Sequence, residues 1–172
     1  GLEELLKKNF KQKRLIFTSD LKLAVEKSDI IFICVGTPTK KNSNSANLNY
    51  VFQVAYQLKK IIKKYKIIIT KSTVPITTGD KIEKILTKLK KKNLVDIVSN
   101  PEFLREGEAI RDFVYPDRVV IGSENLHAEN AMKEVYRPLY LNETPIVFTN
   151  IETAEMIKYA SNSFLATKIS FI

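Results

Sequence analysis

Apolar runs and helical periodicities alternate along the chain. Between the apolar runs, hydrophobic residues recur at helical spacing, as in 51–62, 82–89 and 128–135, which predicts amphipathic helices. Strands are predicted at 15–19, 29–35, 66–70, 95–99, 117–123 and 145–149. The alternation predicts an α/β fold, a doubly wound, Rossmann-like parallel sheet with helices on both faces.

Polar residues mark where the predicted helices begin. Ser19 or Asp20 is expected to cap a short helix that runs to Lys27. Thr149 and Glu152 have the spacing of a capping box, with Thr149 as the N-cap of a long helix that continues to residue 172. The polar segment 40–49 is predicted to be a loop.

Composition narrows the class of protein. The 172 residues suit one domain, or one domain and part of another, and no apolar run approaches membrane-spanning length. The single cysteine, Cys34, excludes an internal disulfide framework and fits a reducing, cytoplasmic setting. Because Cys34 lies in an apolar strand, we expect a core thiol rather than a nucleophile.

The formal net charge of +9 comes mainly from clustered lysines. Three interpretations compete: a solvated surface, a nucleic-acid footprint, and a field that attracts anionic substrates. The lysines fall largely on the outer faces of predicted helices, and no RNA-binding or helix-turn-helix signature accompanies them. A solvated surface is therefore favoured, with no nucleic-acid and no membrane partner.

Three informative segments follow predicted strands: 36–39, 71–75 and 100–108. In a doubly wound sheet, ligands bind outside the carboxyl ends of the strands, so these segments are expected at one binding edge. Thr73 offers a hydroxyl there for a ligand or a water, although it could instead bond to the local backbone. Glu102 and Glu106 share a face if they are helical and could then divide acid and base roles, or they could simply favour a helix N-terminus.

The last predicted helix carries Lys158 and Asn162 four residues apart, hence on one face. An ammonium and an amide on an apolar face can bind an oxyanion, whereas the alternative is a snorkelling lysine at a polar edge. The only histidine, His127, is placed on a surface helix. No metal site is predicted, and the G-x-G-x-x-G spacing of a dinucleotide turn is absent.

Taken together, several motifs carry a resemblance to a known family. They are "GLEELL", "FTSDLKLAV", "DIIFICVGTPT", "KSTVPITTGD", "SNPEFLREGEAIRDFVYPDRVVIG" and "ETAEMIKYASNSFLATKISFI". In order and spacing they resemble the UDP-glucose/GDP-mannose 6-dehydrogenases, and "REG" with "PDRVVIG" is more similar to the UDP-glucose enzymes. The resemblance implies oxidation of the C6 alcohol of a nucleotide sugar to a carboxylate, with two NAD reduced, through a cysteine thioester.

The resemblance also implies roles for individual residues. Thr37, Thr73 and Glu106 would contact NAD, and Thr73 would also orient a catalytic water. Glu102 would serve as the acid–base residue of thioester hydrolysis, while Lys158 and Asn162 would stabilise the oxyanion. The nucleotide sugar would be bound by Glu102, Phe103, Leu104, Arg105, Glu106, Lys158 and Asn162.

The family's Gly-rich loop and nucleophilic cysteine have no match in this chain. We therefore expect a middle piece of an enzyme: residues 1–148 as a partial NAD-binding domain that lacks its first strands, and 149–172 as the start of a central linking helix. The expected partners are UDP-glucose and a second copy in the complete protein, and the piece alone is expected to be inactive. The alternatives are a GDP-mannose enzyme, or a degenerate or split remnant that acts only as a binding module.

Overall fold

A single five-stranded sheet organises the molecule. The computed structural model describes residues 1–172, with the side chain of Leu141 outside that description. The strands lie side by side in chain order and are β1 (Ile30–Ile33), β2 (Lys66–Thr70), β3 (Val95–Ser99), β4 (Val119–Ser123) and β5 (Ile146–Thr149). The first three are parallel, as predicted, and so are β4 and β5 to each other. The fold is thus α/β and Rossmann-like.

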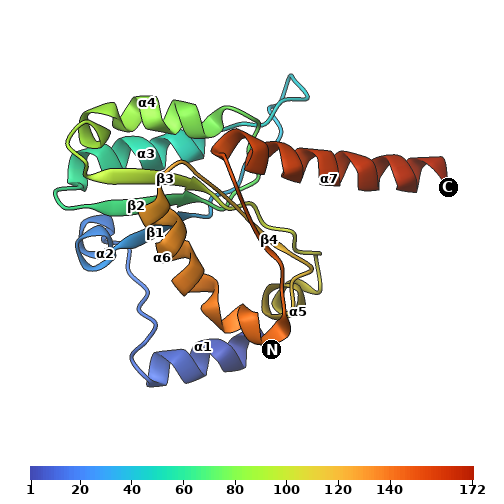
Figure 1. The fold of residues 1–172 in the computed structure, drawn as a ribbon, viewed down its shortest axis with the longest axis horizontal. Coiled ribbons are helices and arrows are strands. Elements are labelled where there is room, and N and C mark those ends of the chain that lie inside the picture. The colour runs from blue at the N-terminus through green and yellow to red at the C-terminus, as the bar shows by residue number, and fades with distance from the viewer.

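Helices cover both faces of this sheet. In Figure 1, α3 and α4 lie over one face and α6 crosses the other, while the far half of α7 extends beyond the body. The helices are α1 (Leu2–Lys11), α2 (Leu21–Lys27), α3 (Asn49–Ile61), α4 (Thr78–Lys90), α5 (Ala109–Val114), α6 (Leu126–Tyr136), the 3-10 helix η1 (Arg137–Asn142) and α7 (Ile151–Phe171). As predicted, Asp20 caps α2, its carboxylate accepting from the N–H of Leu23 at 3.0 Å.

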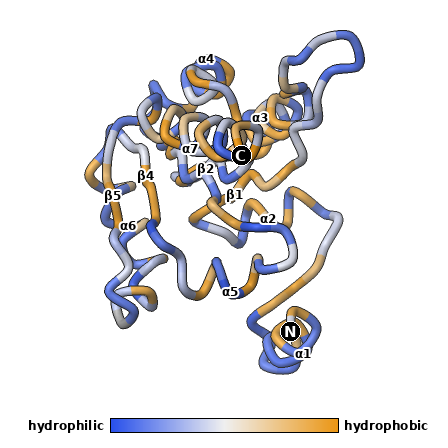
Figure 2. Tube along the Cα trace, turned by 90° about the vertical axis from the view of Figure 1, so that its right-hand side faces the viewer, coloured by the Kyte–Doolittle hydropathy of each residue, from blue (hydrophilic) through white to orange (hydrophobic). Residues whose placement is uncertain are grey.

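Strand β2 explains why the central strands are apolar throughout. Ile68 packs into the core under α3 and α4, whereas Ile67 and Ile69 pack into the core under α6. All three side chains are buried. Successive residues of a strand point to opposite faces, so a strand covered on both sides needs apolar residues at every position. In Figure 2, where α7 overlies the central strands, hydrophobic colouring can be followed on β4 and β5.

Strand β4 departs from the all-parallel prediction, because it runs antiparallel to β3. The pairing is short, joining Val98 to Ser123 and Ser99 to Gly122. A parallel return would need a crossover along the full length of the sheet. Segment 100–118 instead stays beside the carboxyl end of β3, so β4 starts at that edge. Asp117 and Arg118 are thereby delivered to the same edge as the exits of β2 and β3.

Two local predictions differ from the structure, and one helix was not predicted. Segment 15–19 is not a strand, and Ile16 and Phe17 are exposed, because no neighbouring strand pairs with it. Helix α7 is capped by Asn150 rather than Thr149, since Thr149 ends β5 and the Asn150 side chain accepts from the Thr153 N–H at 2.7 Å. Helix α1 was not predicted; it carries an exposed apolar face and lies apart from the sheet in Figure 1.

Glycine at position 122 lets α7 approach β4. A Cβ placed there would lie 2.6 Å from the Cβ of Ala154, 2.7 Å from the backbone oxygen of Asn150 and 2.8 Å from the Cα of Ile151. Two of these atoms belong to the backbone and cannot rotate away. The close packing fixes the direction in which α7 leaves the sheet.

We predict that Gly122→Ala lowers the free energy of unfolding by about 1–3 kcal/mol, the usual cost of overpacking. The measurement is urea unfolding followed by circular dichroism. Gly36→Ala is the matched control, because a Cβ there would meet no atom within 4 Å. Equal stabilities of the two variants would contradict this account of the β4–α7 contact.

Candidate active site

Four of the predicted residues form a continuous chain of contacts at the carboxyl edge of the sheet. The Thr37 hydroxyl donates to the backbone oxygen of Thr73 at 2.9 Å. The Thr73 hydroxyl in turn donates to Oε1 of Glu102 at 3.3 Å. The Lys158 ammonium reaches the same Oε1 at 3.2 Å. Segments after three strands and one turn of α7 therefore converge, as the sequence predicted.

Backbone contacts hold the first two segments together. The Ser72 hydroxyl donates to the backbone oxygens of Val35 at 2.6 Å and Ile33 at 3.2 Å. The N–H groups of Lys71 and Ser72 also donate to the backbone oxygen of Ile33. The Ser72 hydroxyl is thus used to tie the β2 exit to β1, while the Thr73 hydroxyl points to Glu102.

Glu102 is held as a carboxylate. Its Oε2 accepts from the N–H of Leu104 at 2.7 Å. Burial alone would raise the pKa of Glu102, but the Leu104 N–H, the Lys158 ammonium and the Thr73 hydroxyl together lower it below its usual value. The side chain remains 30% exposed, so this carboxylate is oriented from one side and open to solvent on the other.

Lys158 is not a snorkelling lysine. Its side chain is 7% exposed, and its ammonium lies 5.2 Å from the centre of the Phe103 ring as well as against Glu102. Asn162, one turn further along α7, is exposed and lines the same cavity as Lys158. The shared helix face predicted for these two residues is therefore present, with Lys158 buried and Asn162 at the rim.

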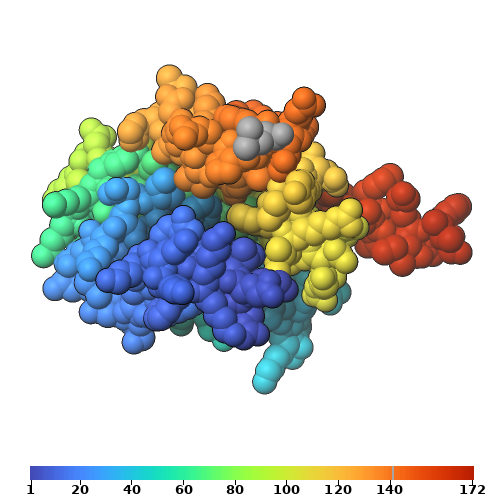
Figure 3. Space-filling model, turned by 90° about the horizontal axis from the view of Figure 1, so that it is seen from below, coloured from blue at the N-terminus to red at the C-terminus, as the bar shows by residue number. Residues whose placement is uncertain are grey.

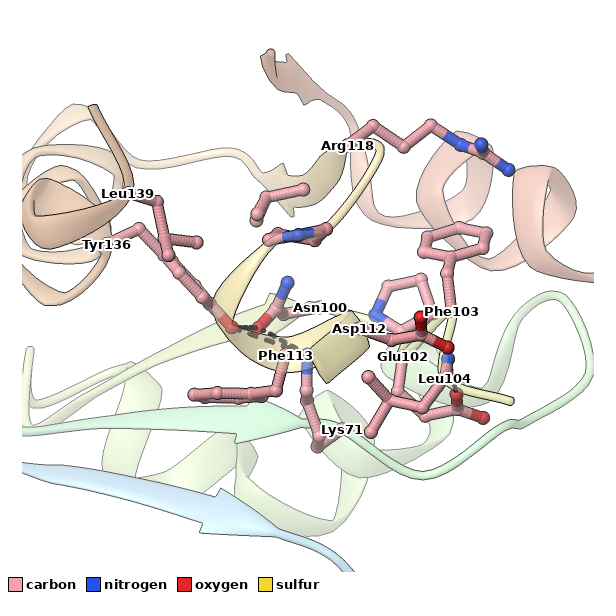
Figure 4. A pocket seen from close by; sticks show the side chains of 13 residues that line it. Lys71, Asn100, Glu102, Phe103, Leu104, Asp112, Phe113, Arg118, Tyr136 and Leu139 are labelled. Carbon is pink, nitrogen blue, oxygen red and sulfur yellow. Dashed lines mark hydrogen bonds between the residues drawn. The ribbon is translucent and has the colours of Figure 1, made fainter. Parts of the chain in front are cut away.

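The segment 102–104 lies between two cavities. On the side of α7 is a cleft of about 470 Å³, lined by Phe103, Leu104, Arg105, Lys158 and Asn162 among others. On the side of β1 is a cavity of about 550 Å³, whose lining includes Cys34, Lys71, Glu102 and Leu104. Figure 4 shows Glu102, Phe103 and Leu104 close together, with Asp112 beside them. Leu104 lines both cavities and Glu102 lines the one on the β1 side, so the site can receive ligand groups on either side of this segment.

Two residues of this site had no individual role in the sequence prediction. The Arg118 guanidinium stacks 4.4 Å from the centre of the Phe103 ring and donates to the Ser161 hydroxyl at 3.2 Å. Asp112 accepts from the Nε and Nη2 of Arg105 at 3.0 and 2.7 Å, and this pairing lowers its pKa to about 2. Arg118 reaches this edge because β4 runs antiparallel to β3. The periodicity of the sequence does not reveal the direction of a strand.

Two predictions about single residues are wrong. Glu106 does not share a helix face with Glu102, because 106–108 is a turn and α5 begins only at Ala109. Among the described side chains, Glu106 has no hydrogen bond or ion pair with the other predicted site residues. Cys34 is exposed rather than buried in the core, since it follows the last residue of β1.

Helix α4, which follows the Thr73 segment, is anchored by a buried acid from α7. Oε1 of Glu155 accepts from the N–H of Gly79 at 2.8 Å, and Glu155 is 1% exposed. A Cβ at Gly79 would lie 2.4 Å from Cγ2 of Ile151, so glycine permits this approach. Burial raises the pKa of Glu155 to about 7 against the opposing effect of the amides of Gly79, Thr77 and Thr78.

The described residues of this site do not form a metal-binding cluster. Among the residues described, no group of three or more His, Cys, Asp or Glu side chains is placed to bind one. Likewise, none of the helices in the described part of the chain is long and apolar enough to cross a membrane.

A nicotinamide dinucleotide fits part of the edge. The Thr37 and Thr73 hydroxyls lie at neighbouring strand exits, and Gly36 leaves open space where a Cβ would be. These groups suit close approach of a ribose or an amide. The five glycines of the chain do not have the spacing of a Gly-rich phosphate-binding loop.

Comparison with known proteins identifies the family to which the chain belongs. Residues 1–140 match the model of the UDP-glucose/GDP-mannose dehydrogenase family, NAD-binding domain. The chain belongs to this family. It is 50% identical over its whole length to a UDP-glucose 6-dehydrogenase of Rhizobium meliloti, and 47% to one of Bacillus subtilis. It spans 40% and 37% of these two relatives.

Solved structures of the family agree in fold. A GDP-mannose dehydrogenase from Pseudomonas aeruginosa superposes with a TM-score of 0.92 at 35% identity. A UDP-glucose dehydrogenase from Pyrobaculum islandicum gives 0.91 at 38% identity. Each match covers 99% of this chain and 40% of the solved chain. The family's cofactor is accordingly NAD, and the sheet described above belongs to its NAD-binding domain.

We predict that Glu155 makes stability fall as pH rises. Its pKa is about 7 in the fold and 4.5 ordinarily, so its contribution is full below about pH 4.5 and is lost as pH rises through about 7. Glu155→Gln should remove this loss of stability, whose total size is on the order of 1–3 kcal/mol. The measurement is urea unfolding from about pH 5 to 8, with the exposed Glu152→Gln as control. Parallel slopes for wild type and Glu155→Gln would contradict the assignment.

Proposed function

We propose that this chain is the central part of an NAD-dependent UDP-glucose 6-dehydrogenase, which oxidises the C6 alcohol of UDP-glucose to the carboxylate of UDP-glucuronate. One alcohol, one water and two NAD⁺ give one carboxylate, two NADH and three protons. The observation that carries the proposal is the contact chain Thr73–Glu102–Lys158 between two cavities.

The proposed roles follow from the atoms that remain free at the site. When bound, NAD accepts the hydride, with Thr37, Thr73 and Glu106 as its contacts in this chain. Glu102 is ionised, so it is ready to take a proton from an attacking water during hydrolysis of the thioester. Thr73, which donates to Glu102, orients that water. The cysteine that forms the thioester is not in this chain.

Lys158 and Asn162 supply the electrostatic part of the mechanism. As an oxygen at C6 gains negative charge, the ammonium and the amide stabilise it from one helix face. The ammonium is shielded from water, with a side chain 7% exposed, which strengthens its field. The sugar nucleotide would occupy the cleft of about 470 Å³ on the α7 side, contacting Phe103, Leu104 and Arg105.

The remaining parts of the proposal concern the complete protein. Residues 1–148 would form part of the NAD-binding domain, and 149–172 would start the helix that links it to the substrate domain and to a second copy. Phe164, Leu165, Ile169 and Phe171 are exposed on the far half of α7, which supports burial of this half in the complete protein. Figure 3 shows that half projecting from the body.

A second candidate substrate is GDP-mannose. The superposition on the Pseudomonas aeruginosa GDP-mannose dehydrogenase, at a TM-score of 0.92, is the observation that supports this substrate. Sequence identity favours UDP-glucose, since relatives with that activity in their names reach 50%. The experiment below therefore offers both sugars and UDP-N-acetylmannosamine.

A segment exchange tests the function. This chain replaces the matching segment of the Rhizobium meliloti UDP-glucose 6-dehydrogenase, and NADH formation is followed at 340 nm with each sugar. We expect turnover with UDP-glucose and at least about a 100-fold lower kcat for Glu102→Gln, the usual scale of acid–base catalysis. A chimera that folds and binds NAD but reduces none with any sugar would refute the proposal, and turnover with GDP-mannose alone would replace the substrate.

The 172-residue chain by itself is predicted to form no NADH from UDP-glucose and NAD. The reason is chemical: it lacks the family's Gly-rich phosphate loop and nucleophilic cysteine. The control is the chimera under the same conditions. NADH production by the isolated chain would contradict the prediction, because it would show that the residues present suffice for turnover.

A further inference from the structure

A second cluster of polar groups lies beneath the Thr73–Glu102 contact and has no part in the proposed mechanism. Lys71 follows β2, and its ammonium donates to Oδ1 of Asn100 at 3.2 Å and to the Tyr136 hydroxyl at 3.3 Å. The Tyr136 hydroxyl also donates to Oδ1 of Asn100. Figure 4 shows the three side chains pointing toward one another from β2, β3 and α6.

Asn100 is the fixed centre of this cluster. It is fully buried, its backbone N–H donates to the backbone oxygen of Thr70 at 2.9 Å, and its Nδ2 donates to the backbone oxygen of Val120 at 2.8 Å. Since the amide nitrogen is committed to β4, the amide oxygen must face Lys71 and Tyr136. A lysine ammonium and a phenol satisfy this oxygen, so the cluster joins β2, β3, β4 and α6.

The residues of the cluster lie close in sequence to Thr73 and Glu102 and can therefore influence the positions of both. Lys71 stands two residues before Thr73, and Asn100 two residues before Glu102. The Lys71–Asn100 hydrogen bond therefore adds a side-chain link between the two segments, just beyond the backbone bond from Asn100 to Thr70. The Thr73–Glu102 hydrogen bond, at 3.3 Å, closes the same two segments further out.

The charge of Lys71 also faces the site. Burial lowers its pKa to about 8, while Glu102 and Cys34 raise it and Lys158 lowers it. Burial raises the pKa of Tyr136 to about 12, so the phenol stays neutral and keeps its proton for Asn100. Lys71 is consequently charged at neutral pH and loses its charge as pH rises through about 8.

We propose that Lys71 is a positioning residue, whose ammonium bridges Asn100 and Tyr136 and thereby holds Thr73 and Glu102 at their working separation. Its effect on catalysis rests on the proposed function. Its effect on Glu102 does not, because the Glu102 carboxylate can be observed in the chain itself.

The first test needs no activity. The Glu102 carboxyl is titrated by carbon-13 NMR in the wild-type chain, in Lys71→Met and in Lys66→Met. Lys66 is the matched control because it is a buried lysine at the opposite end of β2, ion-paired with Asp29 at 3.6 Å. We expect Lys71→Met to raise the pKa of Glu102 toward its ordinary value, and Lys66→Met to leave it unchanged. Equal values in all three proteins would overturn the proposal.

The second test uses the active chimera. Lys71→Met is expected to lower kcat by about 10-fold or more, with KM for UDP-glucose within about threefold, because a small misplacement costs rate rather than binding. The ratio of wild-type to Lys71→Met kcat should shrink as pH rises through about 8. A loss no larger than that of Lys66→Met, or a ratio constant with pH, would assign Lys71 to stability alone. If the wild-type chimera is inactive, the NMR titration still decides the role of Lys71.

Discussion

The ion pair between Lys158 and Glu102 is the interaction on which the site depends. It joins a loop at the sheet edge to a helix that starts about fifty residues later, and Oε1 of Glu102 takes both the ammonium and the Thr73 hydroxyl. An ammonium whose side chain is only 7% exposed is costly to bury unless a carboxylate compensates it. The pair therefore commits α7 and segment 100–104 to one arrangement, with Lys158 lining one cavity and Glu102 the other.

The topology of the sheet supplies the conditions for this pair. The antiparallel course of β4 keeps segment 100–118 at the carboxyl edge, where Arg118 stacks on Phe103. Gly122 then lets α7 leave directly across β4, and Glu155 fastens the same helix to the N-terminus of α4. The contacts at Gly122 and Glu155 hold α7 in place. They thereby fix the position of Lys158, which lies one turn after Glu155.

Much of this could be predicted from the sequence. Strands 66–70 and 95–99 were found to the residue, because a strand buried on both faces must be apolar throughout. The convergence of Thr73 and Glu102 followed from the rule that strand exits meet at one edge, whereas the family resemblance brought Lys158 to the same site. The direction of β4 did not follow, since an apolar run reads the same in both directions. The exposure of Cys34 and the turn at Glu106 depend on where elements end, which periodicity leaves open.

Two glutamates near α7 illustrate how environment assigns roles to one side-chain type. Glu155 is enclosed, meets only backbone amides, and its pKa rises to about 7. Glu102 is partly open and meets an ammonium, a hydroxyl and an amide, and its pKa falls. The enclosed carboxyl can serve only as an anchor, because no ligand reaches it. The open one keeps its charge and lines the cavity on the β1 side, which supports the acid–base role proposed for Glu102 rather than for the more strongly perturbed residue.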